Sequence, residues 1–113
     1  MKKNNVFKDI VEKKIPSEIL YQDKKITVFS DISPKAPVHF LVIPNKIIPS
    51  LNYIKKRDKN LIFHMLRTAI AIAKKKKIYR TGYRLIINCN KNSGQEVPHL
   101  HIHILGGKKL PSI

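Results

Sequence analysis

The chain has 113 residues, a length typical of one domain, and 42% of them are hydrophobic, which is enough for one sizeable core. Lys and Arg number 23 against seven Asp and Glu, a formal net charge of +16. No apolar run approaches the roughly 20 residues of a membrane-spanning helix, and no apolar stretch of a secretory signal follows the charged N-terminus. Cys89 is the one cysteine, which excludes an intramolecular disulfide, so we expect a single cytoplasmic domain over residues 1–113.

The net charge of +16 has two interpretations. A strongly basic chain can bind nucleic acid or another anionic surface. However, only four of the cations are arginines, and the lysines are spread from Lys2 to Lys109 instead of gathering on one predicted face. The charge therefore favours a solvated, lysine-rich surface, and neither nucleic acid nor a membrane is an expected partner.

The first half of the chain alternates apolar and turn-forming stretches. Apolar residues at helical spacing precede the first proline and indicate a short amphipathic helix. Two β-rich stretches separated by a polar pair predict a hairpin, and a loop with two prolines leads into a third β-rich stretch. We expect a helix over residues 6–13, strands over 18–22, 25–30 and 38–43, and a loop over 31–37.

The second half contains the longest periodic segment. Apolar side chains recur at three- and four-residue steps between residues 55 and 77, which predicts a long helix with one face packed on a sheet. Two further β-rich stretches, 83–89 and 98–105, flank a polar loop at 90–95. Meandering strands with one inserted long helix indicate an α+β fold with an antiparallel sheet. The residues expected on the buried helix face are Leu61, Ile62, Met65, Leu66, Ala69, Ile70 and Ala73.

Three of the five histidines lie at alternate positions of the last predicted strand. Side chains at such positions share one face of a strand, about 6.6 Å apart. His99, His101 and His103 are therefore expected on one face, with Leu100, Ile102 and Ile104 directed into the core. A single histidine on an apolar face is usually structural, but three aligned histidines replace three residues that could have packed. The row therefore indicates a chemical function.

Two kinds of chemistry fit a row of imidazoles. A His-x-His pair supplies two metal ligands and needs more, for which His39, Glu96 and Cys89 are the nearby candidates. Alternatively, one imidazole attacks as a nucleophile while its neighbours orient it, carry protons or bind the anion. Nucleophilic catalysis also accounts for the polar loop before the strand, whose amides and Gly94 suit a phosphate. We therefore favour catalysis, with no metal ligand and no required cofactor.

Residues 94–107 resemble the histidine-triad signature, His-φ-His-φ-His-φ-φ with φ apolar. Segments 15–19, 31–40 and 83–88 resemble the HINT branch of this HIT superfamily, the purine nucleoside phosphoramidases that include bacterial HinT-like proteins. The resemblance covers nearly the whole chain. It implies a HIT-like fold, with a five-stranded antiparallel sheet, one long helix and a short N-terminal helix. It also implies a homodimer that joins two sheets across a two-fold.

The resemblance further implies a reaction. His101 would attack the α-phosphorus of a purine nucleoside phosphoramidate or acyl-nucleotide, and water would then cleave the nucleotidyl-histidine to release the nucleoside monophosphate. His103 would contact the phosphate and assist the leaving group, and His99 and His39 would orient the cluster. A neutral imidazole, with an ordinary pKa of about 6.5, is a competent nucleophile, and a covalent step divides one hard displacement into two.

Other positions of the family would bind the nucleotide. Asp31 would accept hydrogen bonds from the ribose hydroxyls. Asn88 and the amides of Gly94 and Gln95 would stabilise the phosphate, and Glu96 would face the leaving group. The purine slot would be formed by Val6, Phe7, Ile10, Phe29 and Ile32.

Two other functions stay open from the sequence. One is a dinucleoside-polyphosphate hydrolase of the Fhit-like branch, which residues 106–107 disfavour because that branch typically continues past the triad with Pro-Arg. The other is a basic nucleic-acid or protein interaction module on the same fold. The chain also departs from animal members of the family at Pro98, which removes a backbone N–H where the strand is expected to begin.

Overall fold

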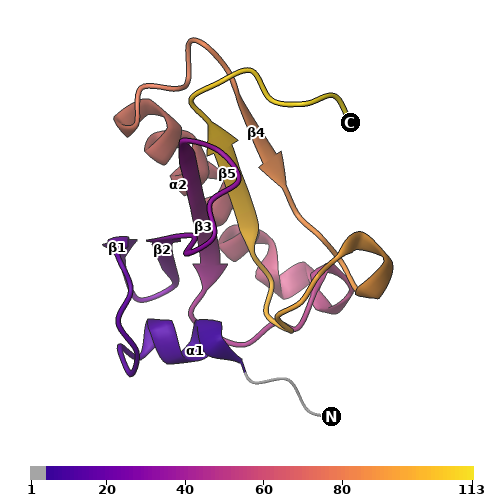
Figure 1. Ribbon diagram of the computed structural model, residues 1–113. Helices are drawn as coiled ribbons and strands as arrows, with labels where there is room; N and C mark the ends of the chain where they lie inside the picture. The colour runs from indigo at the N-terminus through magenta and orange to yellow at the C-terminus, as the bar shows by residue number, and fades with distance from the viewer. Residues whose placement is uncertain (1–4) are drawn as a thin grey trace.

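A five-stranded antiparallel sheet organises the computed structural model, which describes residues 5–113. Its spatial order is β1-β2-β3-β5-β4, and every neighbouring pair is antiparallel (Figure 1). The predicted α+β class is therefore confirmed, while residues 1–4 of the predicted domain lie outside the described part of the chain. The strands are β1 (Ile19–Gln22), β2 (Ile26–Ser30), β3 (Val38–Pro44), β4 (Tyr83–Ile86) and β5 (Ile102–Gly106).

Two α-helices cover opposite faces of the sheet. The long helix α2 (Lys59–Lys75) packs on one face, and the short helix α1 (Val6–Val11) packs on the other (Figure 1). No helix in residues 5–113 is long and apolar enough to cross a membrane. Short 3-10 turns occupy the connections, at η1 (Leu51–Tyr53), η2 (Lys56–Asp58) and η3 (Lys91–Ser93).

Alternate residues of β2 and β3 point to opposite faces and divide the core into two clusters. The larger cluster lies between the sheet and α2, and the smaller one lies between the sheet and α1. The histidines share the face of the smaller cluster, because His103 pairs with Leu41 across β3 and β5. Members of the larger cluster include Ile26, Val28, Val42, Met65 and Ala69, and the buried members of the smaller are Phe7, Ile10, Phe29, Leu41 and Ile43.

The buried face of α2 differs from the predicted one at two positions. Leu66 and Ile70, which we expected on the buried face, are 37% and 39% exposed. Thr68 and Ile72 are buried instead. Apolar residues occur on both flanks of this helix, so periodicity alone does not show which flank meets the sheet.

Both C-terminal strands are shorter than predicted. The strand expected over 98–105 begins at Ile102, because Pro98 has no N–H and the N–H of His99 donates to Val97 O at 2.8 Å, closing a turn. The strand expected over 83–89 ends at Ile86, the last residue of β4 that pairs with β5, opposite His103. The first two histidines of the triad therefore precede the strand instead of lying in it.

A lysine in the left-handed conformation ends α2. Lys77 has φ of 62°, its N–H donates to Lys74 O at 3.0 Å, and the N–H of Ile78 donates to Ala73 O at 3.0 Å. These two bonds form a Schellman motif, in which glycine is the usual left-handed residue. A side chain at this position therefore strains the helix end.

We expect Lys77→Gly to raise the free energy of unfolding by about 0.5–1 kcal/mol, because glycine adopts positive φ without a Cβ clash. Urea denaturation monitored by circular dichroism measures the change. Lys75→Gly, inside the helix, is the control and should lower the stability by about 1 kcal/mol. A destabilised Lys77→Gly variant would contradict the assignment.

Candidate active site

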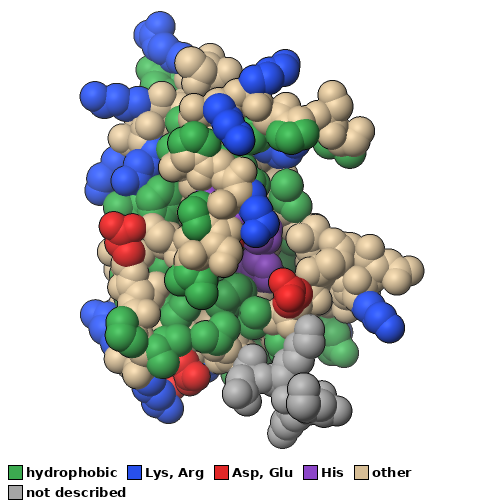
Figure 2. Space-filling model, in the orientation of Figure 1, with side chains coloured by type: hydrophobic (Ala, Val, Ile, Leu, Met, Phe, Trp, Pro, Cys, Tyr) green, Lys and Arg blue, Asp and Glu red, His purple; other side chains and the backbone are tan. Residues whose placement is uncertain are grey.

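The triad histidines lie on the α1 face of the sheet, along a segment that leads from a turn into β5. His99 and His101 are buried, and His103 is half-buried. Histidine surface appears in the middle of one face of the molecule, with an acidic side chain beside it (Figure 2). As predicted, the alternate residues belong to the core cluster under α2; they are Leu100, Ile102 and Ile104.

Hydrogen bonds fix the position of the proton on His99. Its Nε2 lies 2.7 Å from Pro44 O, and a carbonyl only accepts, so Nε2 carries the hydrogen. Its Nδ1 is then an acceptor and lies 3.0 Å from Nδ2 of Asn5, which donates. Burial lowers the pKa of His99, which keeps the ring neutral. Both ring nitrogens are therefore engaged within the protein, so this ring is a positioning group.

The tautomer of His101 is fixed by a backbone carbonyl. Its Nδ1 lies 2.7 Å from His99 O and must donate, so Nε2 holds a free electron pair. Burial lowers the pKa of His101, although the same hydrogen bond acts to raise it. The ring of Phe7 lies edge-on with its centroid 5.0 Å away. His101 is therefore a neutral, oriented imidazole whose Nε2 is available for nucleophilic attack.

A second hydrogen-bonded chain fixes His39 and His103. The N–H of Lys35 donates to His39 Nδ1 at 3.0 Å, so the proton of the neutral ring is on Nε2. That Nε2 lies 3.0 Å from His103 Nδ1, which must accept. His103 consequently carries its own hydrogen on Nε2. Burial, followed by the charges of His101 and His39, lowers the pKa of His103 to about 4, so it is a neutral hydrogen-bond donor.

The structure places Asp31 beside this histidine pair. Its Oδ2 lies 3.4 Å from His39 Nε2, and its Oδ1 accepts from the N–H of Ser33 at 2.8 Å. Burial lowers the pKa of His39, while the carboxylate opposes that effect. Asp31 is half-buried, so the carboxylate that we predicted to contact ribose lies at the site and retains access to solvent.

One group of side chains in residues 5–113 has the geometry to hold a metal ion. Asp31, His39 and His103 each offer one ligand atom, and these atoms lie within 4.8 Å of one another. Imidazoles and a carboxylate are ligands that zinc accepts. This group is not the His-x-His pair considered from the sequence, because it contains one histidine of the row, His103, together with Asp31 and His39. The 3.0 Å hydrogen bond between His39 Nε2 and His103 Nδ1 engages one nitrogen of each ring without an ion.

The residues predicted to form the purine slot fall into two groups. Phe7, Ile10 and Phe29 are buried in the smaller core cluster. Val6 and Ile32 are 36% and 92% exposed. The structure thus brings the first three together behind the triad and leaves the other two at the surface.

The polar loop is closed by its own hydrogen bonds. The N–H groups of Gly94 and Gln95 donate to Lys91 O and Asn90 O, at 3.0 and 3.3 Å. The Gln95 side chain also accepts from the N–H of Asn90 and donates to two carbonyls. A phosphate bound to these two amides would therefore replace existing bonds. The other predicted positions are Asn88, half-buried past the end of β4, and Glu96, which is exposed.

Two residues of the site escaped the sequence-based prediction. Asn5 accepts from the N–H of Lys8 at 3.0 Å, capping α1, and its Nδ2 donates to His99. An asparagine before a helical pattern is a recognisable N-cap, but its contact with a residue 94 positions away is not visible in the sequence. Lys35 acts through its backbone N–H, which any residue except proline provides.

The chain is similar to known proteins over nearly its full length. A sequence profile of the HIT domain matches residues 12–110. A HIT-like protein of Buchnera aphidicola subsp. Acyrthosiphon pisum is 58% identical over 112 residues, which are 99% of this chain and 98% of the relative. Purine nucleoside phosphoramidase of Escherichia coli is 44% identical over 110 residues, covering 97% of this chain and 92% of the relative.

Solved structures show the same fold. A HIT family hydrolase from Legionella pneumophila superposes with a TM-score of 0.93 and 39% identity, covering 96% of each chain. A histidine triad protein from Clostridium difficile has a TM-score of 0.92 and 41% identity, covering 100% of this chain and 99% of the other. With three histidines alternating along the segment that leads into β5 and a profile match over residues 12–110, the chain belongs to the HIT domain family.

Proposed function

We propose that the protein is a nucleotide hydrolase that cleaves the P–N or acyl-phosphate bond of purine nucleoside 5′-phosphoramidates and related adducts, releasing the nucleoside monophosphate. One observation carries the proposal. The hydrogen bond from His101 Nδ1 to His99 O leaves Nε2 of a neutral, buried imidazole as a nucleophile. The 44% identity with the phosphoramidase of Escherichia coli supports this substrate class.

The proposed reaction has two steps at the α-phosphorus. Nε2 of His101 forms a bond to phosphorus as the bond to the leaving group breaks, and the leaving amine takes a proton from solvent. The positive charge that develops on the imidazole is stabilised by His99 O, which accepts the Nδ1 hydrogen at 2.7 Å. Water then attacks phosphorus and loses a proton to solvent, and the P–N bond to His101 breaks with its electron pair returning to Nε2, which leaves the ring neutral.

His103 and Asp31 would bind the substrate in this scheme. His103 offers Nε2–H to a phosphoryl oxygen or to the leaving-group atom, because His39 occupies its Nδ1. Asp31 retains lone pairs that can accept from the ribose hydroxyls. The purine would lie near Ile32, Val6 and Phe7. No cofactor is required, since imidazole itself provides the nucleophile.

The solvent-facing side of α2 supports a homodimer. Phe63, Leu66 and Ile70 are 64%, 37% and 39% exposed and recur at three- and four-residue steps, so they form one apolar stripe. Burying this stripe against a second copy would remove it from water. The half-buried, unpaired Cys89 fits the reducing cytoplasm that we propose as the compartment.

We expect His101→Ala to lower the hydrolysis of adenosine 5′-phosphoramidate by at least about 10³-fold, because the variant lacks the nucleophile. Release of AMP, followed by chromatography, measures the rate. His64→Ala, on α2 outside the cluster, is the matched control and should retain the rate. Equal rates for wild type and His101→Ala would refute the role of His101, and faster turnover of a diadenosine polyphosphate would favour the Fhit-like alternative.

The lowered pKa values predict that activity is lost only at a pH below the ordinary pKa of histidine. Neutral His101 and His103 are the active forms, and burial moves their protonation below the ordinary pKa of about 6.5. We therefore expect kcat/KM to stay level from pH 8 down to pH 6.5 and to fall only at lower pH. A decline centred near pH 7 would contradict this environment. Prior treatment with a chelator should leave the profile unchanged, because no step uses a metal.

We expect Phe63→Lys to convert the homodimer to a monomer, because a buried lysine at the proposed interface would be unpaired. Analytical ultracentrifugation measures the mass of the wild type and the variant. Phe63→Leu keeps the stripe apolar and should remain dimeric. A monomeric wild type at micromolar concentration would overturn the proposed assembly.

A further inference from the structure

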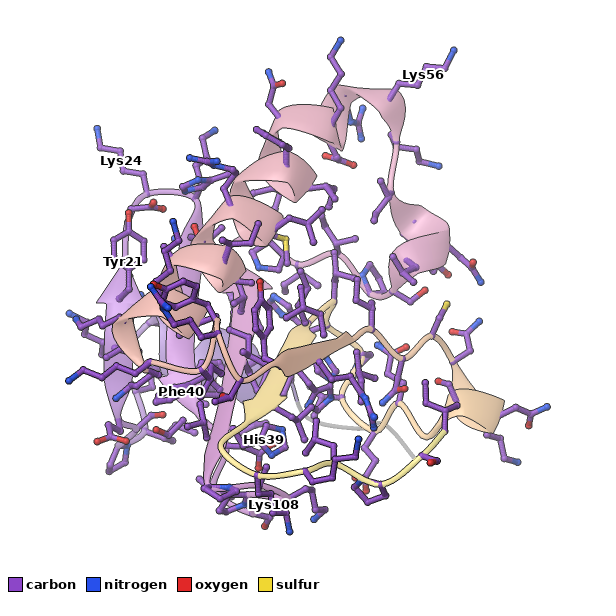
Figure 3. The ribbon with its side chains drawn as sticks, turned by 90° about the horizontal axis from the view of Figure 1, so that it is seen from above. Tyr21, Lys24, His39, Phe40, Lys56 and Lys108 are labelled. Carbon is purple, nitrogen blue, oxygen red and sulfur yellow. The ribbon has the colours of Figure 1, made fainter. Side chains whose placement is uncertain are left out.

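A cavity of about 470 Å³ lies on the α2 side of the sheet, opposite the face that carries the histidines. This volume falls in the range of small-ligand sites. Its walls come from the turn between β1 and β2, the chain after β3, η2 and the start of α2. Lys24, on the wall formed by the turn, lies well apart from His39 in Figure 3. The ionisable residues of the lining are Lys24, Lys25, Lys46, Arg57, Asp58 and His64.

One wall is braced by Asp23, which ties the β1–β2 turn to α2. Its Oδ2 lies 2.8 Å from His64 Nε2, and its Oδ1 accepts from the N–H groups of Lys25 and Ile26 at 2.7 and 2.8 Å. Burial raises the pKa of Asp23, but these hydrogen bonds outweigh it and hold the pKa below the usual range. The carboxylate is therefore fully used in holding the turn in place.

The other wall is braced by Asp58 at the start of α2. Its Oδ1 lies 2.8 Å from Lys46 Nζ, and its Oδ2 accepts from the N–H of Lys55 at 2.9 Å. Asp58 is buried, and the hydrogen bond from Lys46 is the main reason that its pKa is lowered. Both oxygens of this second carboxylate are thus occupied by protein donors.

Three cations of the cavity have no such partner. Lys24, Lys25 and Arg57 are exposed, and none of them forms an ion pair with the carboxylates of residues 5–113. Because Lys46 pairs with Asp58, the lining keeps an excess of positive charge, and a concave site with such an excess attracts counter-ions. The two bracing carboxylates fix the turn and the start of α2, the segments that carry these three cations around the cavity.

We propose that this cavity is a second anion site, which binds a compact group of two or more linked phosphates such as pyrophosphate or the phosphate chain of a nucleotide. Guanidinium at Arg57 can pair with phosphate oxygens in a bidentate manner, while the lysines act as point charges. The described lining contains no Phe, Tyr or Trp, and its one imidazole, His64, is engaged by Asp23, so charge pairing offers more to a ligand here than base stacking does. The phosphates, and not a base, are therefore the recognised part.

The site can be tested with pyrophosphate as the probe, at low salt. Amide shifts in ¹H–¹⁵N spectra distinguish the cavity, at Lys25, Asn60 and His64, from the histidine site at His101, because each site reports on its own residues. We expect wild-type protein to show saturable shifts at both places. The double variant Lys25→Gln/Arg57→Gln should weaken the cavity response at least 10-fold and leave the response at His101 and the phosphoramidate turnover unchanged.

A matched double variant, Lys74→Gln/Lys75→Gln, removes the same charge from the far end of α2 and should bind pyrophosphate as the wild type does. Equal weakening in both double variants would overturn the proposal, because the lysine-rich surface as a whole would then be responsible. Absence of cavity shifts with pyrophosphate would also overturn it. An oligonucleotide without terminal phosphates that binds through these residues, while pyrophosphate does not, would assign the surface to nucleic acid instead.

Discussion

The hydrogen bond from His101 Nδ1 to the carbonyl of His99 is the interaction on which the site depends. It decides which ring nitrogen keeps a free electron pair, and it places a partial negative charge where the imidazole would become positive in the proposed attack. The carbonyl of His99 precedes the first residue of β5, so it lies outside the sheet ladder. The turn at Pro98, closed by the bond from His99 N–H to Val97 O, delays β5 until Ile102 and so leaves the carbonyl available.

The late start of β5, at Ile102, explains which sequence-based predictions were right and which were wrong. Alternation identified the three histidines and the core residues between them, because side chains alternate in an extended segment whether or not it is paired. The same alternation led us to begin the last strand at Pro98. A pattern of period two cannot distinguish a hydrogen-bonded strand from the extended, unpaired segment that precedes it. The error in the strand boundary therefore covers His99 and His101, which precede the first residue of β5.

The tautomers of the histidines could not be predicted from any sequence pattern. Asn5 and Lys35 lie 94 and four positions from the rings that they contact, and one of them acts only through its backbone. Their donors set the protons of His99 and His39, and the latter sets His103 in turn. Each proton is thus determined by contacts that exist only after α1 and the loop before β3 have packed on the sheet.

The sheet separates a neutral histidine site from a cationic cavity, which shows where part of the net charge of +16 lies. On the α1 face, burial keeps the histidines neutral, so the phosphate recognition proposed there would use hydrogen-bond donors and an electron pair. On the α2 face, Asp23 and Asp58 are consumed in bracing pairs, so three cations remain to act on a ligand. A neutral site suits bond making, because a protonated imidazole has no electron pair, whereas a cationic site suits retention of an anion without chemistry. The excess of lysines therefore need not act at the histidine site. Part of it lines the cavity on the opposite side of the sheet.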